Sequence, residues 1–473
     1  MDFQNQLREN IGSKKEILDR EMLKFTLKLY NNPLLSRKAV GEIIETFDDF
    51  ISELFIPFLQ SEIKSNLAHL QHEQSFKQVQ FILENNKHTF NEFSTEHRRF
   101  KLYKDQSFYI EPEEIEIGEE AIHVIKDPEN IEVKMKKVYA AHVPLKKTLE
   151  NFFKIPGMFE ETNEHYKKLM AEKDVISNFV QGDLWRKKYC LQNEEKIVFP
   201  IGLYFDEFQT GNVLGSHALE QKFGGVYISI LCLPPHLIAK LENIFVLTIF
   251  YSKHLQEFGN KNIFSRIIQD LNLVSDEGIK INVNGKHLQV YFECAQIFGD
   301  NLGLNYICGF QKSFIALHYC RICKASSKQC QEMLVENKKL IRTIESYEKD
   351  LSTDDSKSTG IVEECVFHMV NKFNITENVS VDFAHDLEEG VAVYSLSGVL
   401  EQLIKDKEIT LDQINNRIET FPYSDAEKPN KPRPLFFSPD KNGRFKLKIK
   451  QSASEMLCLV RYLGLTLEIV YHT

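Results

Sequence analysis

The sequence feature that most constrains the fold is the apolar run from Ile197 to Asp206, IVFPIGLYFD. It is rich in Ile, Val, Tyr and Phe and too short to span a membrane, so it predicts a strand buried on both faces. Pro200 must then lie near the start of this strand or at a bulge. Because a buried carboxylate is costly unless it is paired or binds a metal, Asp206 is either a structural turn former or a metal ligand.

The composition limits the classes of protein to which the chain can belong. Its 473 residues are 42% hydrophobic and 27% charged, which allows a large core and predicts two to four domains. The start is polar and charged, and no apolar stretch is long enough for a membrane span, so we expect no secretion signal and no membrane partner. The nine cysteines should then stay reduced. A formal net charge of −10 argues against wholesale nucleic-acid binding, which would have to use local basic patches.

Hydrophobic periodicity divides the chain into five parts. We expect a helical N-terminal region over 1–100, an acidic linker with short strands over 101–143, a first core part over 144–310, an insertion over 311–445 and a final helix over 446–473.

The order of elements in the core predicts its fold. Two further apolar runs, GGVYISILCLP and NIFVLTIFYS, follow Asp206, and an amphipathic helix and a fourth strand, HLQVYFECAQIFGD, come next. This fourth strand ends in Asp300, as the first ends in Asp206. Three strands, a helix and a fourth strand, with acids ending the first and the fourth, is the order of a ribonuclease H-like fold. We therefore expect an α/β protein with a ribonuclease H-like mixed sheet, a large helical insertion and a helical N-terminal region.

In that fold the strands ending in Asp206 and Asp300 lie side by side, so the two carboxylates repel unless a divalent cation lies between them. Glu455, on the final helix, would complete an oxygen-only site for two Mg²⁺ (or Mn²⁺) ions, which suits phosphoryl transfer. The alternative for Glu455 is a solvent-facing helix acid. Ser452 or Ser454 could cap that helix.

A second metal candidate is the pair Cys320-Arg-Ile-Cys323, whose spacing lets two thiolates bind one Zn²⁺. A single pair is half a site, and the candidates for the other half are His385, which we rank first, then His368, Cys365, Cys330 and His318. Two reduced structural cysteines are the alternative. Asp382 and His385 are three residues apart, so the acid can equally hydrogen-bond to the imidazole as a helix begins.

Basic residues alternate with apolar ones in DKNGRFKLKIK, where the cations are Arg444, Lys446, Lys448 and Lys450. Such a strand presents its cations on one face, which suits contact with a DNA backbone beside Glu455. It also suits an exposed edge strand that lysines protect from aggregation.

Four of these stretches together resemble a known family. In order they are FPIGLYFDEFQTGNVLGSH, GDNLGLNYICGFQKSFIALHYCRIC, ENVSVDFAHDLEEGV and KQSASEMLCLVRYL, within about 144–463. They resemble the catalytic core of transposon-derived DDE transposases of the CACTA-like and Kyakuja-Dileera-Zisupton type. The resemblance implies a metal-binding triad of Asp206, Asp300 and Glu455, with motif residues Cys320, Cys323, Asp382 and His385. It also implies Mg²⁺-dependent DNA cleavage and strand transfer in the nucleus, with transposon ends and target DNA as partners and a homodimer as a candidate assembly.

The sequence departs from that family at both ends. The chain stops soon after Glu455, where more helical sequence is expected, so we expect a truncated copy. No zinc finger or helix-turn-helix precedes the core. The alternative function is therefore a domesticated protein without catalysis that binds DNA or a chromatin partner.

Overall fold

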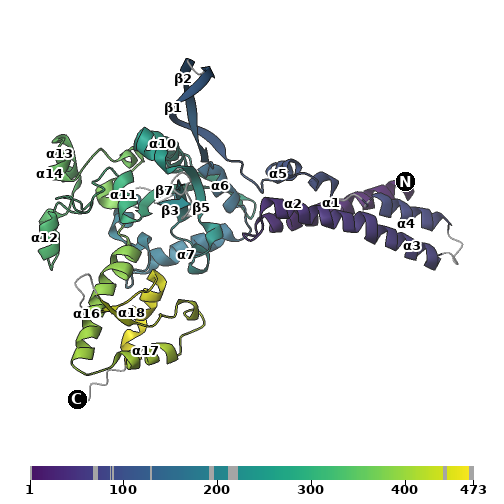
Figure 1. Ribbon diagram of the computed structural model, residues 1–473. Helices are drawn as coiled ribbons and strands as arrows, with labels where there is room; N and C mark the ends of the chain where they lie inside the picture. Colours follow the sequence, from purple (N-terminus) through teal and green to yellow (C-terminus); the bar gives the residue numbers. More distant parts are fainter. Residues whose placement is uncertain are drawn as a thin grey trace. The chain divides into compact units, whose positions relative to one another are not determined.

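The computed structural model describes residues 3–67, 73–85, 87, 90–127, 130–190, 196–210, 222–439 and 445–467. The chain divides into two compact units, Met1–Glu111 and Pro112–Thr473 (Figure 1).

The first unit is helical, as its amphipathic pattern predicts. Ser36 and Thr95 cap α2 and α5 through their hydroxyl groups, and Val40, Ile44 and Tyr103 are buried in its core. Its helices are α1 (Phe3–Tyr30), α2 (Arg37–Asp49), α3 (Ile56–Leu67), α4 (Glu73–Asn85) and α5 (Glu96–Asp105), with a π-helical segment Phe50–Phe55 joining α2 to α3. The unit ends at Glu111 rather than at the expected position 100.

The second unit is a mixed α/β structure built on a seven-stranded sheet of order β1-β2-β5-β4-β3-β7-β6. All neighbouring strands are antiparallel except β3 and β7, which are parallel. The strands are β1 (Glu113–Asp127), β2 (Asn130–His142), β3 (Ile197–Gln209), β4 (Lys222–Ile230), β5 (Phe245–Tyr251), β6 (Ile279–Val283) and β7 (Lys286–Gly299). The predicted strand at Ile197 is confirmed, and its residues 198–203 are all buried.

The region 101–143 differs from the expected linker with short strands. It contributes the end of α5 and two strands of 15 and 13 residues, β1 and β2, which pair along their length. Only Ala141 and His142 of β2 pair with β5, so most of this hairpin extends from the sheet (Figure 1). Gly118 lies against the ring of Phe258 on α10, and a Cβ there would come within 2.4 Å of the ring. The alternating pattern of EIEIGEE was the signal for a long strand.

The parallel pair β3 and β7 contains a bulge that sets its register. Ile201 lies opposite Cys294, but Gly202 lies opposite Gln296, so Ala295 is the extra residue on β7. Beyond the bulge the pairing continues to Phe205 opposite Gly299.

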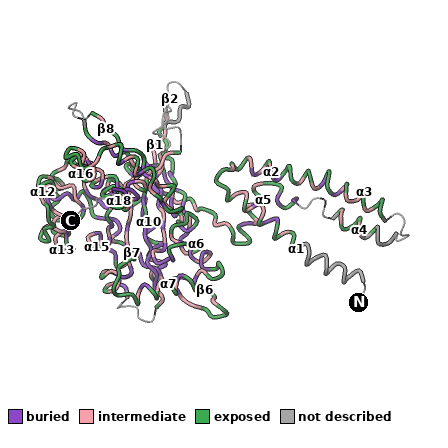
Figure 2. The backbone as a smooth tube through the Cα atoms, turned by 90° about the horizontal axis from the view of Figure 1, so that it is seen from below, coloured by how far each residue is buried: buried purple, intermediate pink, exposed green. Residues whose placement is uncertain are grey.

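Helices cover the sheet and bury its apolar side chains. Figure 2 shows buried residues concentrated along β7 and α10. Phe264 of α10 packs against Phe205 of β3 and Phe250 of β5, while Phe153 and Phe159 pack against Phe199. The covering helices are α6 (Leu145–Phe152), α7 (Met158–Ala171) and α10 (Ser252–Asp276), with the short helices α8 (Asp183–Trp185) and α9 (Pro235–Ile238) in the connections.

The segment after β7 begins with α11 (Asn301–Ile307) and continues as loops with short helices. These are α12 (Ser327–Glu332), α13 (Ile344–Ser352), α14 (Ser356–Thr359) and α15 (Ile375–Asn378). Val379 then forms a parallel bridge with Ile297 of β7, and the backbone N–H of Ser380 donates to the carbonyl of Ile297. The predicted fifth strand is therefore reduced to a bridge on the outer edge of β7.

The last part of the chain packs around a separate apolar cluster. Leu400, Ile414, Leu447, Met456 and Leu459 are buried in it. Its elements are a π-helical turn Ala384–Val391, α16 (Ala392–Lys405), α17 (Leu411–Thr420), the two-stranded sheet of β8 (Phe436–Pro439) and β9 (Phe445–Lys448), and α18 (Ala453–Leu467).

Candidate functional site

Two aspartates meet where the central parallel strands end. Phe205 and Gly299 are the last paired residues of β3 and β7, so Asp206 and Asp300 follow side by side. Their carboxylates interact, because the charge of Asp300 acts on Asp206. The sequence-based prediction that these two acids converge agrees with this arrangement.

Two glycines allow this close approach. A Cβ on Gly299 would come within 2.8 Å of the backbone oxygen of Phe205, and one on Gly303 would come within 2.7 Å of Asp300 Oδ1. Asp300 is the N-cap of α11, and its carboxylate accepts a hydrogen bond from the Gly303 backbone N–H. The strand end and the helix start therefore fix the position of Asp300.

The electrostatics of the pair favour a counter-charge. Partial burial raises the pKa of Asp206, and the negative charges of Asp300 and Glu207 raise it further, against a backbone hydrogen bond that lowers it. Burial and the charge of Asp206 also raise the pKa of Tyr204 and of Tyr227. A divalent cation would relieve the repulsion between the two carboxylates.

Asp382 and His385 lie close to this pair. The Nδ1 of His385 is 2.6 Å from Asp382 Oδ2, and its backbone N–H donates to Asp382 Oδ1 at 3.1 Å. Burial alone would lower the pKa of His385, but the hydrogen bond to Asp382 and the charges of Asp382, Glu389 and Asp300 raise it overall. The imidazole side chain is 58% exposed. The expected hydrogen bond within the DxxH motif is confirmed.

A buried arginine joins the cysteine loop to this site. Arg321 Nη1 donates to Asn301 Oδ1 at 2.7 Å, and Nη2 donates to the carbonyl of Ser380 at 3.1 Å. Asn301 in turn donates to Asp386 Oδ1 at 2.6 Å. Arg321 thus connects the loop between Cys320 and Cys323 to the residues that follow β7.

The two cysteines are close together. The Cys323 backbone N–H lies 3.3 Å from Cys320 Sγ and donates to it, and hydrogen bonds from Cys323 lower the pKa of Cys320 to about 6. Cys320 and His385 line one cavity with Asp300. Of the other zinc candidates, Cys365 is buried against Cys308, His368 Nε2 accepts from the Ile375 N–H at 3.3 Å, and His318 Nδ1 is 3.2 Å from the Lys324 carbonyl. Cys330 lies near Cys323 and Tyr319.

Glu455 forms a capping box at the start of α18. Its Oε2 accepts from the Ser452 N–H at 2.7 Å, and its own N–H donates to Ser452 Oγ at 3.3 Å. Arg433 donates to the same oxygen from Nε at 3.0 Å and from Nη2 at 2.7 Å. The charged group that acts on the Glu455 carboxylate is therefore Arg433. The charged groups that act on Asp206 include Asp300 but not Glu455. Within the described ranges, no three His, Cys, Asp or Glu side chains are arranged to hold a metal ion.

The basic segment, made of β9 and the two residues after it, has the predicted alternation of exposed and buried side chains. Lys446 and Lys450 are exposed and Lys448 is partly exposed, while Leu447 and Ile449 are buried. Arg444 lies outside the described residues. This geometry suits both a DNA-facing strand and a protected edge strand.

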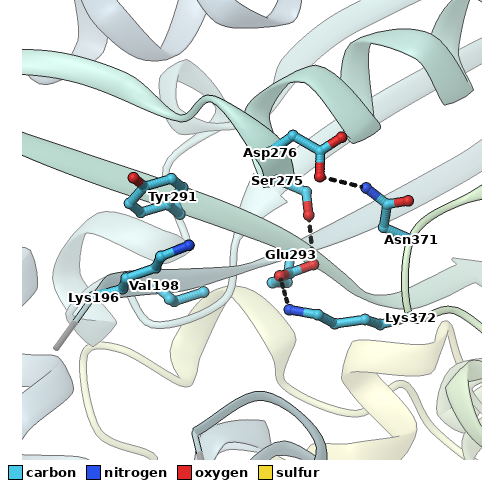
Figure 3. A pocket seen from close by; sticks show the side chains of 8 residues that line it. All are labelled: Lys196, Val198, Ser275, Asp276, Tyr291, Glu293, Asn371 and Lys372. Carbon is cyan, nitrogen blue, oxygen red and sulfur yellow. Dashed lines mark hydrogen bonds and ion pairs between the residues drawn. The ribbon is translucent and has the colours of Figure 1, made fainter. Parts of the chain in front are cut away.

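A second cavity, of about 380 Å³, lies toward the starts of β3 and β7 (Figure 3). Its buried carboxylate, Glu293, accepts hydrogen bonds from Lys372 at 2.6 Å and from Ser275 at 3.0 Å. Lys196 lies over the ring of Tyr291, with Nζ 4.5 Å from its centroid. Because the carboxylate of Glu293 is already paired, we interpret its ion pair with Lys372 as a structural contact that joins the loop at Lys372 to the sheet.

Sequence reasoning missed Asn301, Arg321 and the tyrosines Tyr204 and Tyr227. Tyr204 lies two residues before Asp206 on β3, and Tyr227 lies opposite Tyr204 on β4. Their positions in the alternation along the strands were a usable signal. The Ser-x-x-Glu spacing of Ser452 and Glu455 was likewise readable as a capping box. Nothing in the sequence marks Arg321 or Asn301, because their contacts depend on how the loops fold.

Comparisons with other proteins leave the family open. No protein-family model matches the chain, and no curated protein matches it significantly in sequence. In the part of the chain that the structure describes, no helix is both long enough and apolar enough to cross a bilayer.

Proposed function

We propose that this protein is a transposase-like enzyme that cleaves DNA strands and joins the freed 3′-hydroxyl to target DNA in a Mg²⁺- or Mn²⁺-dependent reaction. The observation that carries the proposal is the meeting of Asp206 and Asp300 at the ends of the parallel strands β3 and β7. The proposed partners are transposon ends and target DNA, and the proposed location is the nucleus.

The strand order supports the proposed ribonuclease H-like core. β5, β4, β3 and β7 are neighbours in that order, and Val379 adds a parallel bridge to the outer edge of β7. This is the order expected from three antiparallel strands, a helix and two further strands. Fold analogy alone does not give function, so the proposal rests on the carboxylates.

The residues present fit hard divalent cations, because carboxylate oxygens are their preferred ligands. Bound ions would polarise the phosphate and stabilise the charge that develops during in-line transfer. Asp206 and Asp300 would hold these ions where β3 and β7 end. His385, held by Asp382, presents an exposed imidazole beside them.

Glu455 is the proposed third acid of the triad. To join Asp206 and Asp300, its carboxylate would have to give up its bonds to Ser452 and Arg433. Zinc held by Cys320, Cys323 and His385 is a separate proposal, supported by the two adjacent sulfurs and by the position of Cys320 and His385 on one cavity.

The capping role of Glu455 favours a second candidate function. A transposase-derived protein without catalysis would retain the core and use it to bind DNA or a chromatin partner, with zinc as its only metal. The exposed cations Lys446, on β9, and Lys450, two residues after β9, would then contact phosphates.

The test compares metal binding and plasmid nicking by the full chain with those of the Asp206→Asn and Asp300→Asn variants. The matched control is Glu207→Gln, since Glu207 is the next acid on β3 and is paired with Lys222. Loss of one metal-binding carboxylate should reduce the nicking rate by about 100-fold or more and weaken Mn²⁺ binding in calorimetry. The control should keep both. Equal Mn²⁺ binding and nicking in all four proteins would refute the proposal, and DNA binding without nicking would favour the second function.

A further inference from the structure

The two-stranded sheet of β8 and β9 gathers cations on one of its faces. Phe436 lies opposite Lys448. Ser438 lies opposite Lys446, and since alternate residues of a strand share a face, all four side chains lie on one side of the sheet. Lys450, two residues beyond Lys448, continues this side, and its Nζ lies 5.6 Å from the centroid of the Phe436 ring. We call this surface, which contains three lysines, one serine and one aromatic ring, the ribbon face.

The open edge of β9 is already covered, so the lysines are not needed to protect it. Ser397 and Glu401 of α16 both bind the backbone of Leu447. The hydroxyl donates to the Leu447 carbonyl at 3.2 Å, and the carboxylate accepts from the Leu447 N–H at 2.5 Å. Lysines protect an edge strand when its backbone groups are unpaired. Edge protection therefore does not explain the lysines at this position, and an anionic partner does.

The three lysines of the ribbon face have no acid partner among the described residues, although nearby cations such as Lys431 and Arg461 do. The carboxylate of Glu401, which α16 brings to the strand, is bound to a backbone N–H instead. Alternate residues of a strand are about 7 Å apart, so the lysines form a row of positive charge. Such a row fits a chain of phosphates better than a single small anion.

Phe436 adds a feature that charge alone does not provide. Its side chain is 40% exposed although it lies among the lysines. An exposed ring beside a row of cations is the combination that binds single-stranded nucleic acid, because bases stack on the ring while cations contact the phosphates. The bases of a duplex are stacked on one another and cannot use the ring. A lipid surface fits less well, since one ring offers little apolar area for insertion.

We infer that the ribbon face binds a single-stranded segment of DNA, with one base stacked on Phe436 and phosphates at Lys446, Lys448 and Lys450. The inference rests on the proposed function for the identity of the strand as DNA. It gives this part of the chain a role that Asp206 does not have, which is to hold an unpaired strand without cleaving it.

The test measures binding of the full chain to a fluorescently labelled single-stranded oligonucleotide by anisotropy, in EDTA and over a range of salt concentrations. Phe436→Ala should weaken binding by about 5- to 150-fold without changing the salt dependence, as expected for one lost base stack. Phe436→Trp, which keeps a stacking ring, should bind like the wild type. Replacement of all three lysines by Gln should lower the slope of log K against log salt by about 2, because each phosphate contact on a single strand contributes about 0.7.

Two matched controls separate the ribbon face from its surroundings. Phe437→Ala is the control for the ring, because Phe437 is 37% exposed but shares its face with Leu447 rather than with the lysines. Lys405→Gln, at the exposed end of α16, is the control for charge. Both should bind the strand like the wild type. A duplex of the same sequence should bind more weakly, and Phe436→Ala should not affect that binding.

Wild-type affinity for the single strand in either Phe436→Ala or the triple lysine variant would overturn the inference, as would an equal loss in the two controls. It would also be overturned if the chain bound phosphatidylserine vesicles and not the single strand. Nicking is assayed separately with Asp206→Asn. If nicking depends on Asp206 but strand binding does not depend on the ribbon face, only this inference fails. If strand binding depends on the ribbon face but no nicking occurs, only the proposed cleavage fails.

Discussion

Replacement of Glu455 distinguishes a structural carboxylate from a metal ligand. In Glu455→Ala the capping box with Ser452 is lost, at a cost of about 1 kcal/mol. The pair with Arg433 is also lost, and because the Arg433 side chain is 58% exposed, it contributes at most about 1 kcal/mol. The helix α18 should therefore be destabilised by about 1–2 kcal/mol, which is a factor of roughly 5–30 in local opening. Glu455→Gln keeps the capping box and should change opening by less than about threefold.

Hydrogen–deuterium exchange of peptides covering 453–467 in the full chain measures this local opening. Glu455→Ala should exchange faster there, while peptides from α10 should not change. The reasoning fails if exchange in α18 is the same in wild type and Glu455→Ala. If Mn²⁺ affinity also falls in both Glu455 variants, Glu455 acts as a metal ligand.

The pH dependence of this contribution has a definite sign. Burial would raise the pKa of Glu455, but the Ser452 N–H and the Arg433 guanidinium lower it overall below its ordinary value of 4.5. The stabilisation is then fully present above the ordinary pKa and is lost as the pH falls through the lowered one. Thermal melts of wild type and Glu455→Ala should differ at pH 7 and converge in strong acid.

Two further changes test the geometry of the site. In Gly303→Ala the new Cβ would lie 2.7 Å from Asp300 Oδ1 and 3.2 Å from Phe205, so we expect the cap of α11 to weaken by about 1 kcal/mol and Mn²⁺ affinity, measured by calorimetry, to fall; unchanged affinity would contradict this. In Asp382→Asn the pKa of His385 should fall. In the wild type, the raised pKa of His385 stabilises the fold fully below the unfolded pKa of about 6.5, and this stabilisation is lost as the pH rises through the folded pKa. The variant should have less of this stabilisation. NMR titration, with the His385 signal assigned by His385→Gln, checks this, and identical titration of His385 in both proteins would refute it.

The core strands could be predicted from sequence because their signals are local. The apolar run ending in Asp206 and the strand ending in Asp300 are continuous stretches whose burial is evident from residue type alone. Strand order then predicts that the two acids lie side by side, which agrees with the pairing of Phe205 with Gly299.

Other parts depend on contacts between distant segments. Arg321 could not be assigned, because its partners Asn301 and Ser380 lie 20 and 59 residues away in the chain. The length of the hairpin of β1 and β2 was underestimated because its dense acids obscured the alternation. Glu455 was predicted to be a metal ligand from its residue type and its position on the final helix. The nearby Ser452 offered a local explanation, because the two residues form a capping box.

The extra residue on β7 decides which acids face each other. Because Ala295 is left out of the pairing, Gln296 lies opposite Gly202, and Asp300 follows beside Asp206. If Ala295 were paired with Gly202 instead, Gly299 would lie beside Asp206, and Asp300 would lie beside Glu207 with its side chain on the opposite side of the sheet. The bulge at one alanine, a residue with no chemistry of its own, thus aligns the two halves of the proposed cation site.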